Sequence, residues 1–236
     1  MISCVCVTTA ARSWCLPLAV EAFRRQTYQG DELLVVSDGS AVPDCPPGDR
    51  CRRVHLVGTR TLGAKRNEAV LMARGDVIVC WDDDDVHHPR RLETIAELMA
   101  QGARAVGSVQ LVWVDLFSDL RWRYVYRGQR PYLVGGSMAF RKDDWEAAGG
   151  YDEAGTGEPG RPEDTRFTWR LCARVGDQRA VIDDVSLYVP LRHGGNSTLP
   201  PSQRSSRFSC WFGSLDDEAE AGIVRARRAW MSKESA

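Results

Sequence analysis

Strand-like and helix-like segments alternate along residues 1–102, and this alternation constrains the fold of the 236-residue chain most strongly. Short apolar, β-branched runs are separated by longer segments whose apolar residues recur at helical spacing. Parallel strands need crossover connections of this kind, so the pattern predicts βαβ units and an α/β sheet buried on both faces. The expected strands are residues 4–9, 32–40, 53–58 and 76–81, and the expected helices are residues 16–26, 62–75 and 88–102.

The second half of the chain is less regular. Strands are expected at 105–116 and 121–127, with a turn at Ser118-Asp119 between them. Because no linker, repeat or low-complexity segment interrupts the chain, we expect a single compact domain over residues 1–236. The other expected elements are a strand, a short helix and a Gly-Gly turn within 132–153, a helix at 161–176, a strand and a glycine-rich turn within 180–196, and an amphipathic helix at 215–231.

Charge and hydropathy exclude several classes of protein. The chain has 31 Lys and Arg against 32 Asp and Glu, so its net charge of −1 gives no sign of general nucleic-acid binding. No apolar stretch is long enough to span a bilayer, and the N-terminus lacks the basic region of a signal peptide. We therefore expect a cytoplasmic protein with reduced thiols. Cys45 and Cys51 could pair or bind metal, but a plain loop is the favoured interpretation.

Polar residues directly follow three of the expected strands. They are Thr8-Thr9, Asp38-Gly39-Ser40 and the run from Asp82 to Asp85. Ligands of parallel sheets bind beyond the carboxyl ends of the strands. We therefore expect these three segments to converge on one edge of the sheet.

The four aspartates from Asp82 to Asp85 require a cation, because adjacent like charges repel one another. Mg²⁺ and Mn²⁺ bind such carboxylates together with water and substrate phosphate. On an extended chain, Asp82 and Asp84 would point to one side and Asp83 and Asp85 to the other. The competing interpretation is a solvated acidic turn that caps the next helix, a role that suits Asp85.

Four segments stand in an order that is typical of one family. Residues 2–40 end in "DGS", and residues 62–85 end in an Asp-x-Asp motif; residues 134–153 begin with "VGG", and residues 163–171 begin with "ED". A weaker match follows at "RHGGNST", residues 192–198. Taken together, these segments resemble the family 2 glycosyltransferases, which have the GT-A fold.

The resemblance implies both a fold and a reaction. The GT-A fold is a Rossmann-like, mixed and mostly parallel sheet flanked by helices, with a nucleotide-sugar and metal half at 1–110 and an acceptor and catalytic-base half at 111–236. The donor would be a nucleotide-diphosphate sugar, a UDP-sugar in the first instance. The acceptor would be a hydroxyl group on a glycan, lipid, protein or small molecule. Mn²⁺ or Mg²⁺ would stabilise the diphosphate leaving group, and a single displacement would invert the anomeric carbon.

The resemblance also implies a role for each matching position. Asp164 would be the catalytic base, and Asp84 and His193 would hold the metal. The donor would be bound by Thr8, Asp38, Lys65, Arg66, Asp82 and Asp83, and Gly135, Gly136, Ser137 and Glu163 would lie on the acceptor side.

Two features depart from the family pattern. Ser37 stands where many relatives carry a second acid, so a single carboxylate, Asp38, would bind the base of the donor nucleotide. Thr8 and Thr9 stand where a proline is frequent, so the choice of nucleotide stays open.

Structural interpretations also remain for individual residues. Lys65 and Arg66 could face solvent, Gly135-Gly136 could be a tight turn, and Glu163 and Asp164 could be acids of a first helical turn. His87 and His88 are expected to begin the following helix rather than bind metal.

Two other functions compete with glycosyl transfer. A nucleotidyltransferase would need a glycine-rich, phosphate-binding loop after the first strand, and "TTAARSWC" contains no glycine. A non-catalytic nucleotide-sugar-binding module would not need Asp84 or Asp164, both of which are retained.

Overall fold

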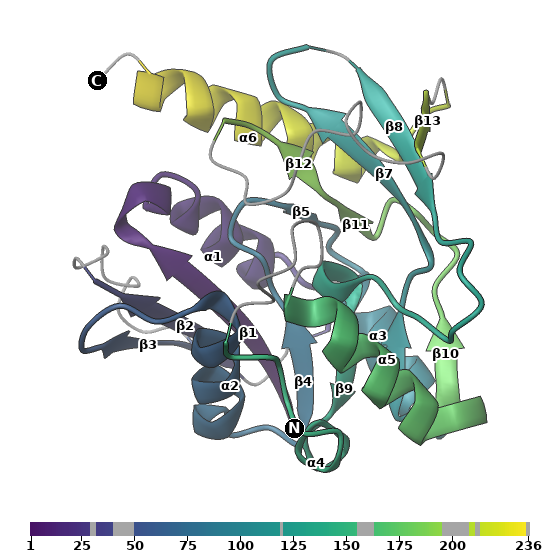
Figure 1. Cartoon of the computed structure of the whole chain (residues 1–236). Helices are drawn as coiled ribbons and strands as arrows, with labels where there is room; N and C mark the ends of the chain where they lie inside the picture. Colours follow the sequence, from purple (N-terminus) through teal and green to yellow (C-terminus); the bar gives the residue numbers. More distant parts are fainter. Residues whose placement is uncertain are drawn as a thin grey trace.

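A computed structural model describes residues 1–28, 32–39, 50–118, 120–154, 163–194, 208–210 and 213–234. Its central sheet consists of β1 (Ile2–Thr9), β2 (Glu32–Asp38), β3 (Cys51–Leu56), β4 (Val77–Cys80), β6 (Ala105–Gly107), β9 (Ala139–Arg141) and β10 (Arg179–Val181). The seven strands lie in the order β10-β6-β9-β4-β1-β2-β3 (Figure 1). Only β9 runs antiparallel to its neighbours among these strands. The expected mixed, mostly parallel α/β sheet is therefore confirmed.

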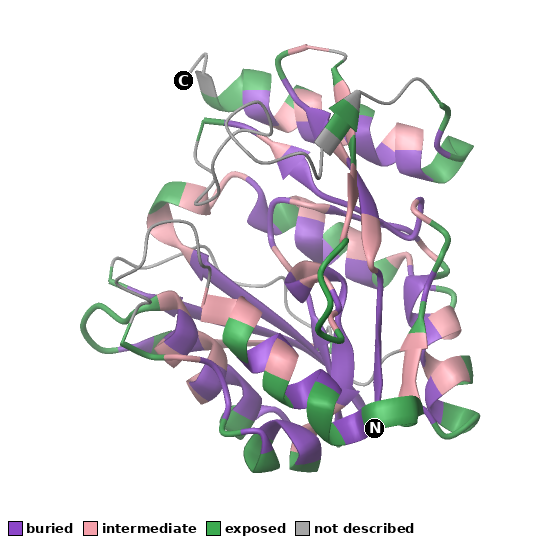
Figure 2. Ribbon diagram, turned by 45° about the vertical axis from the view of Figure 1, so that its right-hand side comes forward, coloured by how far each residue is buried: buried purple, intermediate pink, exposed green. Residues whose placement is uncertain are grey.

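Helices cover both faces of this sheet. α1 (Leu16–Arg24) and α3 (Arg91–Ala100) pack on one face, and α2 (Leu62–Met72), α4 (Lys142–Ala147) and α5 (Glu163–Val175) pack on the other. Alternate residues of β1 point to opposite faces, so that Cys4 contacts the first group of helices and Val5 the second. Figure 2 shows buried central strands between helices whose outer surfaces are exposed. Burial on both faces explains the continuous apolar runs of β1, β2 and β4.

A second layer lies beyond the carboxyl ends of the central strands (Figure 1). It contains two small sheets, the short helices η1 (Ala10–Arg12) and η2 (Gly135–Ser137), and the C-terminal helix α6 (Asp217–Glu234). Ile223 and Trp230 of α6 pack with Val112 and Val114 in one apolar cluster, against which Trp14 also packs. One small sheet pairs β5 (Val86–His87) with β11 (Tyr188–Val189), and the other consists of β12 (Leu191–Arg192), β7 (Gln110–Asp115), β8 (Arg121–Val125) and β13 (Phe208–Cys210). A third short helix, η3 (Gly176–Gln178), connects α5 to β10 at the amino ends of the central strands.

The expected single strand at 105–116 is wrong, because the segment bends and joins two sheets. β6 belongs to the central sheet and β7 to the four-stranded sheet. At the bend, the backbone N–H of Ser108 donates to Ser137 Oγ at 2.9 Å. The apolar residues on both sides of the bend are buried, so the hydrophobic pattern alone does not reveal it.

The expected helix start at His87 and His88 is also wrong. His87 lies in β5 and pairs with Tyr188, and α3 begins at Arg91. This pairing partner lies about a hundred residues away in sequence, so local spacing did not predict the strand.

Among the cysteines whose side chains the structure describes, all follow the expectation of free thiols except Cys51, for which the favoured interpretation as part of a plain loop is wrong. Cys4, Cys6, Cys15, Cys80 and Cys172 are free and buried, whereas Cys51 is disulfide-bonded. Cys45, Ser40, Asp119 and the glycine-rich turn beyond Gly194 lie outside the described residues. Within the described ranges, no helix is both long and apolar enough to cross a membrane. The proposed division into halves at 1–110 and 111–236 stays a prediction.

Candidate active site

The acidic run forms a turn at the carboxyl end of β4. The Tyr188 hydroxyl lies 3.3 Å from Asp82 Oδ2 and also contacts Asp85, whereas the guanidinium of Arg12 pairs with both Asp83 and Asp84. The expected pairing of alternate aspartates is therefore wrong. The pleated strand ends at Cys80. The acidic run that follows forms a turn, which brings its first and fourth residues, Asp82 and Asp85, close together.

Arg12, from η1, supplies positive charge to this turn. Its Nε donates to Asp83 Oδ1 at 2.9 Å, and its Nη2 lies 2.5 Å from Asp84 Oδ1; the Thr8 hydroxyl also donates to Asp83. Burial raises the pKa of Asp83 to about 6. Burial acts in the same direction on Asp84, but the hydrogen bond from His193 and the charge of Arg12 outweigh it, so the pKa of Asp84 is lowered. Asp84 is thus the more strongly anionic carboxylate of the two.

His193 lies directly beside Asp84. Its Nε2 is 3.0 Å from Asp84 Oδ2, and the side chain is buried between Trp14 and Trp230, with ring centroids 5.3 Å and 5.0 Å away. A carboxylate oxygen next to an imidazole nitrogen suits Mn²⁺, and suits Mg²⁺ less well. No cluster of three or more His, Cys, Asp or Glu forms a metal site in the described part of the chain. The residues present therefore fit a cation with two protein ligands that takes its others from water and substrate phosphate.

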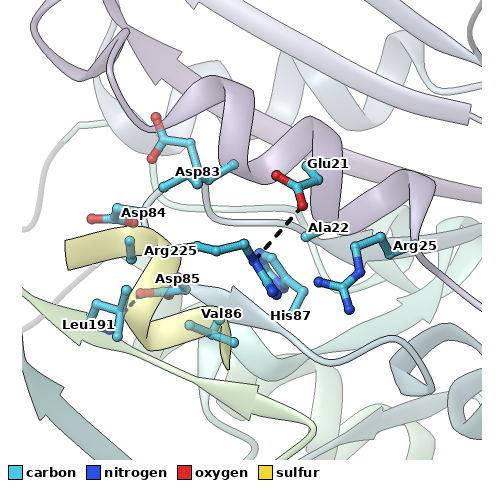
Figure 3. A pocket seen from close by; sticks show the side chains of 13 residues that line it. Glu21, Ala22, Arg25, Asp83, Asp84, Asp85, Val86, His87, Leu191 and Arg225 are labelled. Carbon is cyan, nitrogen blue, oxygen red and sulfur yellow. Dashed lines mark hydrogen bonds and ion pairs between the residues drawn. The ribbon is translucent and has the colours of Figure 1, made fainter. Parts of the chain in front are cut away.

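Asp85 fixes the acidic turn in place. Its Oδ1 accepts a hydrogen bond from the backbone N–H of Leu191 at 2.9 Å, and Figure 3 shows its carboxylate directed toward Leu191. Burial, and then the charges of the neighbouring aspartates, raise the pKa of Asp85 well above its usual range. The expected role as a helix cap is wrong, because the N-cap of α3 is Arg90 and has no side-chain cap.

Space is limited on the side of the acidic turn that faces α1 and α6. A cavity of about 30 Å³ lies there, and its charged lining residues are Asp83, Asp84, Asp85, Glu21, Arg25 and Arg225 (Figure 3). Glu21 and Arg225 form an ion pair of 3.9 Å across it. This volume admits about two water molecules.

A buried ion pair joins the ends of β1 and β2. Lys65 Nζ lies 2.6 Å from Asp38 Oδ1 and donates to the carbonyl oxygen of Thr8 at 3.2 Å. Burial acts to raise the pKa of Asp38, but hydrogen bonds from Lys65 and from the backbone N–H of Arg60 outweigh it, so that pKa is lowered. Asp38 is therefore an ionised carboxylate at the sheet edge. The solvent-facing interpretation of Lys65 is wrong, since this side chain is buried.

Arg66 connects the acidic turn to α5. Its Nη1 lies 2.6 Å from Glu163 Oε1, and its Nη2 lies 3.3 Å from Asp82 Oδ1. The guanidinium also stacks over the Tyr151 ring, 5.5 Å from the centroid. Three of the expected site residues, Arg66, Asp82 and Glu163, are thus brought together from three separate elements.

Asp164 follows Glu163 in the first turn of α5. Burial, and then the charge of Glu163, raise the pKa of Asp164 to about 6, although the charge of Arg66 opposes this. Such a carboxylate is ionised at neutral pH yet more basic than an exposed aspartate, which suits a general base.

The Gly-Gly segment allows two carboxylates to approach the backbone of η2. A Cβ atom at Gly135 would lie 1.9 Å from Asp164 Oδ2, and one at Gly136 would lie 2.5 Å from Asp82 Oδ2 and 2.0 Å from the hydroxyl oxygen of Tyr188. Neither position has room for a side chain. The two glycines therefore form the surface between Asp82 and Asp164.

Replacing Gly135 by Ala is expected to lower kcat by displacing the Asp164 carboxylate while leaving the fold intact. The control is Gly194→Ala, where the nearest atom to a new Cβ is 3.9 Å away, in Trp230. Steady-state kinetics with circular dichroism of both variants would check this. Equal activity of the two variants would show that the position of Asp164 does not depend on Gly135.

Ser137 contributes to the fold beside the glycines. Its hydroxyl donates to the carbonyl oxygen of Val134 at 2.7 Å and accepts the N–H of Ser108. These bonds hold η2 against the bend between β6 and β7. The acceptor-side role of Ser137 stays a prediction.

Arg91 is a buried residue that stabilises the site through hydrogen bonds to its backbone. The sequence did not indicate this role. Its Nη2 donates to the carbonyl oxygens of Cys80 at 3.0 Å and Gly136 at 2.9 Å, and its Nη1 donates to His87 Nδ1. Because His87 accepts at Nδ1, its Nε2–H donates to the carbonyl oxygen of Asp82, 2.8 Å away. Burial lowers the pKa of His87 well below its usual range, so the ring is neutral. Arg91 thus ties the acidic turn to the Gly-Gly segment.

Sequence reasoning also missed Arg12, Tyr188, Trp14 and Trp230. Arg12 lies 71 residues from Asp83 in sequence, and Tyr188 lies 103 residues from Asp85. No local spacing reports such contacts. One signal was available for Arg12, because it lies three residues beyond a strand end that was expected to reach the site.

The central sheet, with helices on both of its faces, has the arrangement of the GT-A fold. The chain belongs to glycosyl transferase family 2, whose family model matches residues 4–151. This confirms the family that the ordered motifs indicated.

The chain is also similar to three proteins of known identity. Over 196 residues the chain is 24% identical to the glucosyl-dolichyl phosphate glucuronosyltransferase of Haloferax volcanii, covering 74% of this chain and 62% of the relative. The fold is similar to that of S. aureus TarS 1–349 in complex with UDP-GlcNAc, with a TM-score of 0.62 at 16% identity, covering 83% of this chain and 59% of TarS 1–349. It is also similar to the mannosyltransferase PcManGT from Pyrobaculum calidifontis in complex with GDP-Man and Mn²⁺, with a TM-score of 0.53 at 17% identity. This match covers 81% of this chain and 56% of PcManGT. The chain spans less than two thirds of each of these relatives.

Proposed function

We propose that the protein is a metal-dependent, inverting glycosyltransferase that moves a sugar from a nucleotide-diphosphate sugar to a hydroxyl acceptor. The observation that carries this proposal is the convergence of two functional groups at the carboxyl edge of the sheet. One is the Asp84–His193 pair, and the other is the Asp164 carboxylate. Arg66, Asp82 and the Gly-Gly segment connect the two.

The donor nucleotide would bind along the ends of β1 and β2. The ionised Asp38 carboxylate would accept hydrogen bonds from the base or ribose, and Lys65 would hold that carboxylate in position. Two structural neighbours are complexes with UDP-GlcNAc and with GDP-Man, which supports a nucleotide sugar as the donor class. The identities of the nucleotide and the sugar are left to experiment.

Asp84 and His193 would hold the metal, and the donor diphosphate would complete its ligands. When bound, a divalent cation supplies charge stabilisation to the departing diphosphate. One structural neighbour is a complex that contains Mn²⁺, which supports this choice of ion. Arg66 would add a fixed positive charge beside Asp82.

Asp164 would take the proton from the acceptor hydroxyl. With its pKa raised to about 6, it is ionised at neutral pH. A single displacement assisted by one base inverts the anomeric carbon, as in inverting glycosidases. Glu163, which is held by Arg66, would orient α5 and with it the base.

A thermal-shift screen of UDP- and GDP-sugars, with and without Mn²⁺, tests the proposed function. A donor at about 100 times its Kd should add about 2.7 kcal/mol to the free energy of unfolding, and only when Mn²⁺ is present. Equal shifts in EDTA would contradict metal dependence, and the absence of any shift would contradict the donor class. Donor binding without turnover on any hydroxyl acceptor would instead favour a non-catalytic binding module.

His193→Ala is expected to weaken donor binding at pH 8 more with Mn²⁺ than with Mg²⁺, because imidazole is a better ligand for the softer ion. His88→Ala is the matched control, since His88 Nε2 also lies 3.0 Å from a carboxylate, that of Asp216, outside the acidic turn. Calorimetry with each metal measures the effect. If His193→Ala matches the wild type with both metals, His193 does not bind the cation.

A further inference from the structure

Arg12 contacts the same carboxylate that is proposed to hold the metal. Its Nη2 lies 2.5 Å from Asp84 Oδ1, and the other oxygen of Asp84 lies 3.0 Å from His193 Nε2. Both oxygens of Asp84 are therefore engaged within the protein itself. A cation that binds Asp84 has to compete with these contacts.

The arrangement places Arg12 over two carboxylates that are almost completely buried. The side chain of Arg12 is 23% exposed, whereas those of Asp83 and Asp84 are 0% and 7% exposed. The planar guanidinium donates in two directions, which a lysine ammonium does less well. It thereby neutralises two adjacent acids that would otherwise repel each other in a buried position.

Arg12 has a second anchor that does not involve the metal ligand. Its Nε donates to Asp83 Oδ1 at 2.9 Å, and Asp83 is held in turn by the hydroxyl of Thr8. A guanidinium that leaves Asp84 would keep this bond to Asp83. It would then stay next to the incoming cation and repel it.

We infer that Arg12 is the resident counter-ion of the acidic turn, and that a divalent cation has to displace its guanidinium from Asp84 in order to bind. Arg12 thereby lowers the affinity of the free protein for metal. This inference rests on the proposed function, because it takes Asp84 as the metal ligand. It adds that the four-aspartate run has an internal cation, supplied by the segment after β1.

Titration of the free protein with Mn²⁺ alone, followed by electron paramagnetic resonance, tests this inference. Arg12→Gln should bind Mn²⁺ at least about tenfold more tightly than the wild type, because a positive charge beside the site is removed. The control is Arg104→Gln. Arg104 also bridges two adjacent acids, Asp143 at 2.7 Å and Asp144 at 2.6 Å, but lies by α4, away from the acidic turn. Its removal should leave Mn²⁺ affinity unchanged.

The possible outcomes separate the inference from the proposed function. Equal or weaker Mn²⁺ binding by Arg12→Gln overturns the inference, and leaves metal dependence intact if the wild type binds. Mn²⁺ binding by neither free protein overturns the inference, and it overturns the metal dependence as well if the donor does not restore binding. If circular dichroism shows that Arg12→Gln is unfolded, Arg12→Lys is tested in its place. This variant keeps the positive charge but loses the geometry that lets arginine bridge Asp83 and Asp84. It should bind Mn²⁺ more tightly than the wild type, and affinity at or below that of the wild type overturns the inference.

Discussion

Asp164→Asn is expected to lower kcat by about 10²–10⁴-fold while donor affinity stays within a few-fold of the wild type. Asparagine keeps the shape of the side chain beside Gly135 but cannot accept the proton of the acceptor hydroxyl. Turnover with the donor found by the screen, together with calorimetry of donor binding, measures both quantities. The control is Asp152→Asn, because Asp152 is another carboxylate that could serve as the base; its Oδ1 lies 3.3 Å from Arg170 Nη1. Near-normal turnover of Asp164→Asn, with a loss in Asp152→Asn, would transfer the role of the base to Asp152.

The pH dependence of the wild type gives an independent check. Since burial and the charge of Glu163 raise the pKa of Asp164 to about 6, the base becomes protonated as the pH falls through that value. kcat/KM should therefore be constant above about pH 7 and decrease below about pH 6. The residual activity of Asp164→Asn should lack this decrease. A wild-type profile that is flat down to pH 5 would exclude Asp164 as the base.

Asp84→Asn is expected to abolish metal-dependent donor binding without unfolding the protein. Loss of an outer-shell partner typically costs about 10–100-fold in metal affinity, and loss of a direct ligand should cost at least as much. Asparagine keeps the size of the side chain, while Asp83 remains as a partner for Arg12. Mn²⁺ titration followed by donor titration measures the loss.

Asp216→Asn is the matched control for this second prediction. Asp216 and His88 form a carboxylate–imidazole pair at 3.0 Å, the same separation as in the pair of Asp84 and His193. Mn²⁺ affinity should be unchanged in Asp216→Asn. If Asp84→Asn binds the donor equally well in EDTA and in Mn²⁺, with an affinity close to that of the wild type, the metal hypothesis is wrong.

Much of the fold could be predicted from local patterns. The alternation of apolar strands and amphipathic helices predicted β1, β2, β4, α1 and α2 to within a few residues. These patterns are reliable because each element buries its own apolar face, and the residues of that face recur at a regular spacing within one short segment. β5, β11, β12 and β13 are two or three residues long and were missed. Such strands exist only through pairing with distant partners, for which a local pattern has no signal.

The same division applies to the candidate site. The sequence by itself determined which chemical groups are available at the sheet edge, because the polar residues that end β1, β2 and β4 have to meet there. Only the tertiary structure decided how those groups are paired. Asp83 and Asp84 share Arg12, while Asp82 and Asp85 share Tyr188, because the acidic run turns after Cys80 instead of continuing as a strand. The partner of a buried charge is fixed by which side chain the fold brings within a few ångströms, and that distance is independent of separation along the chain.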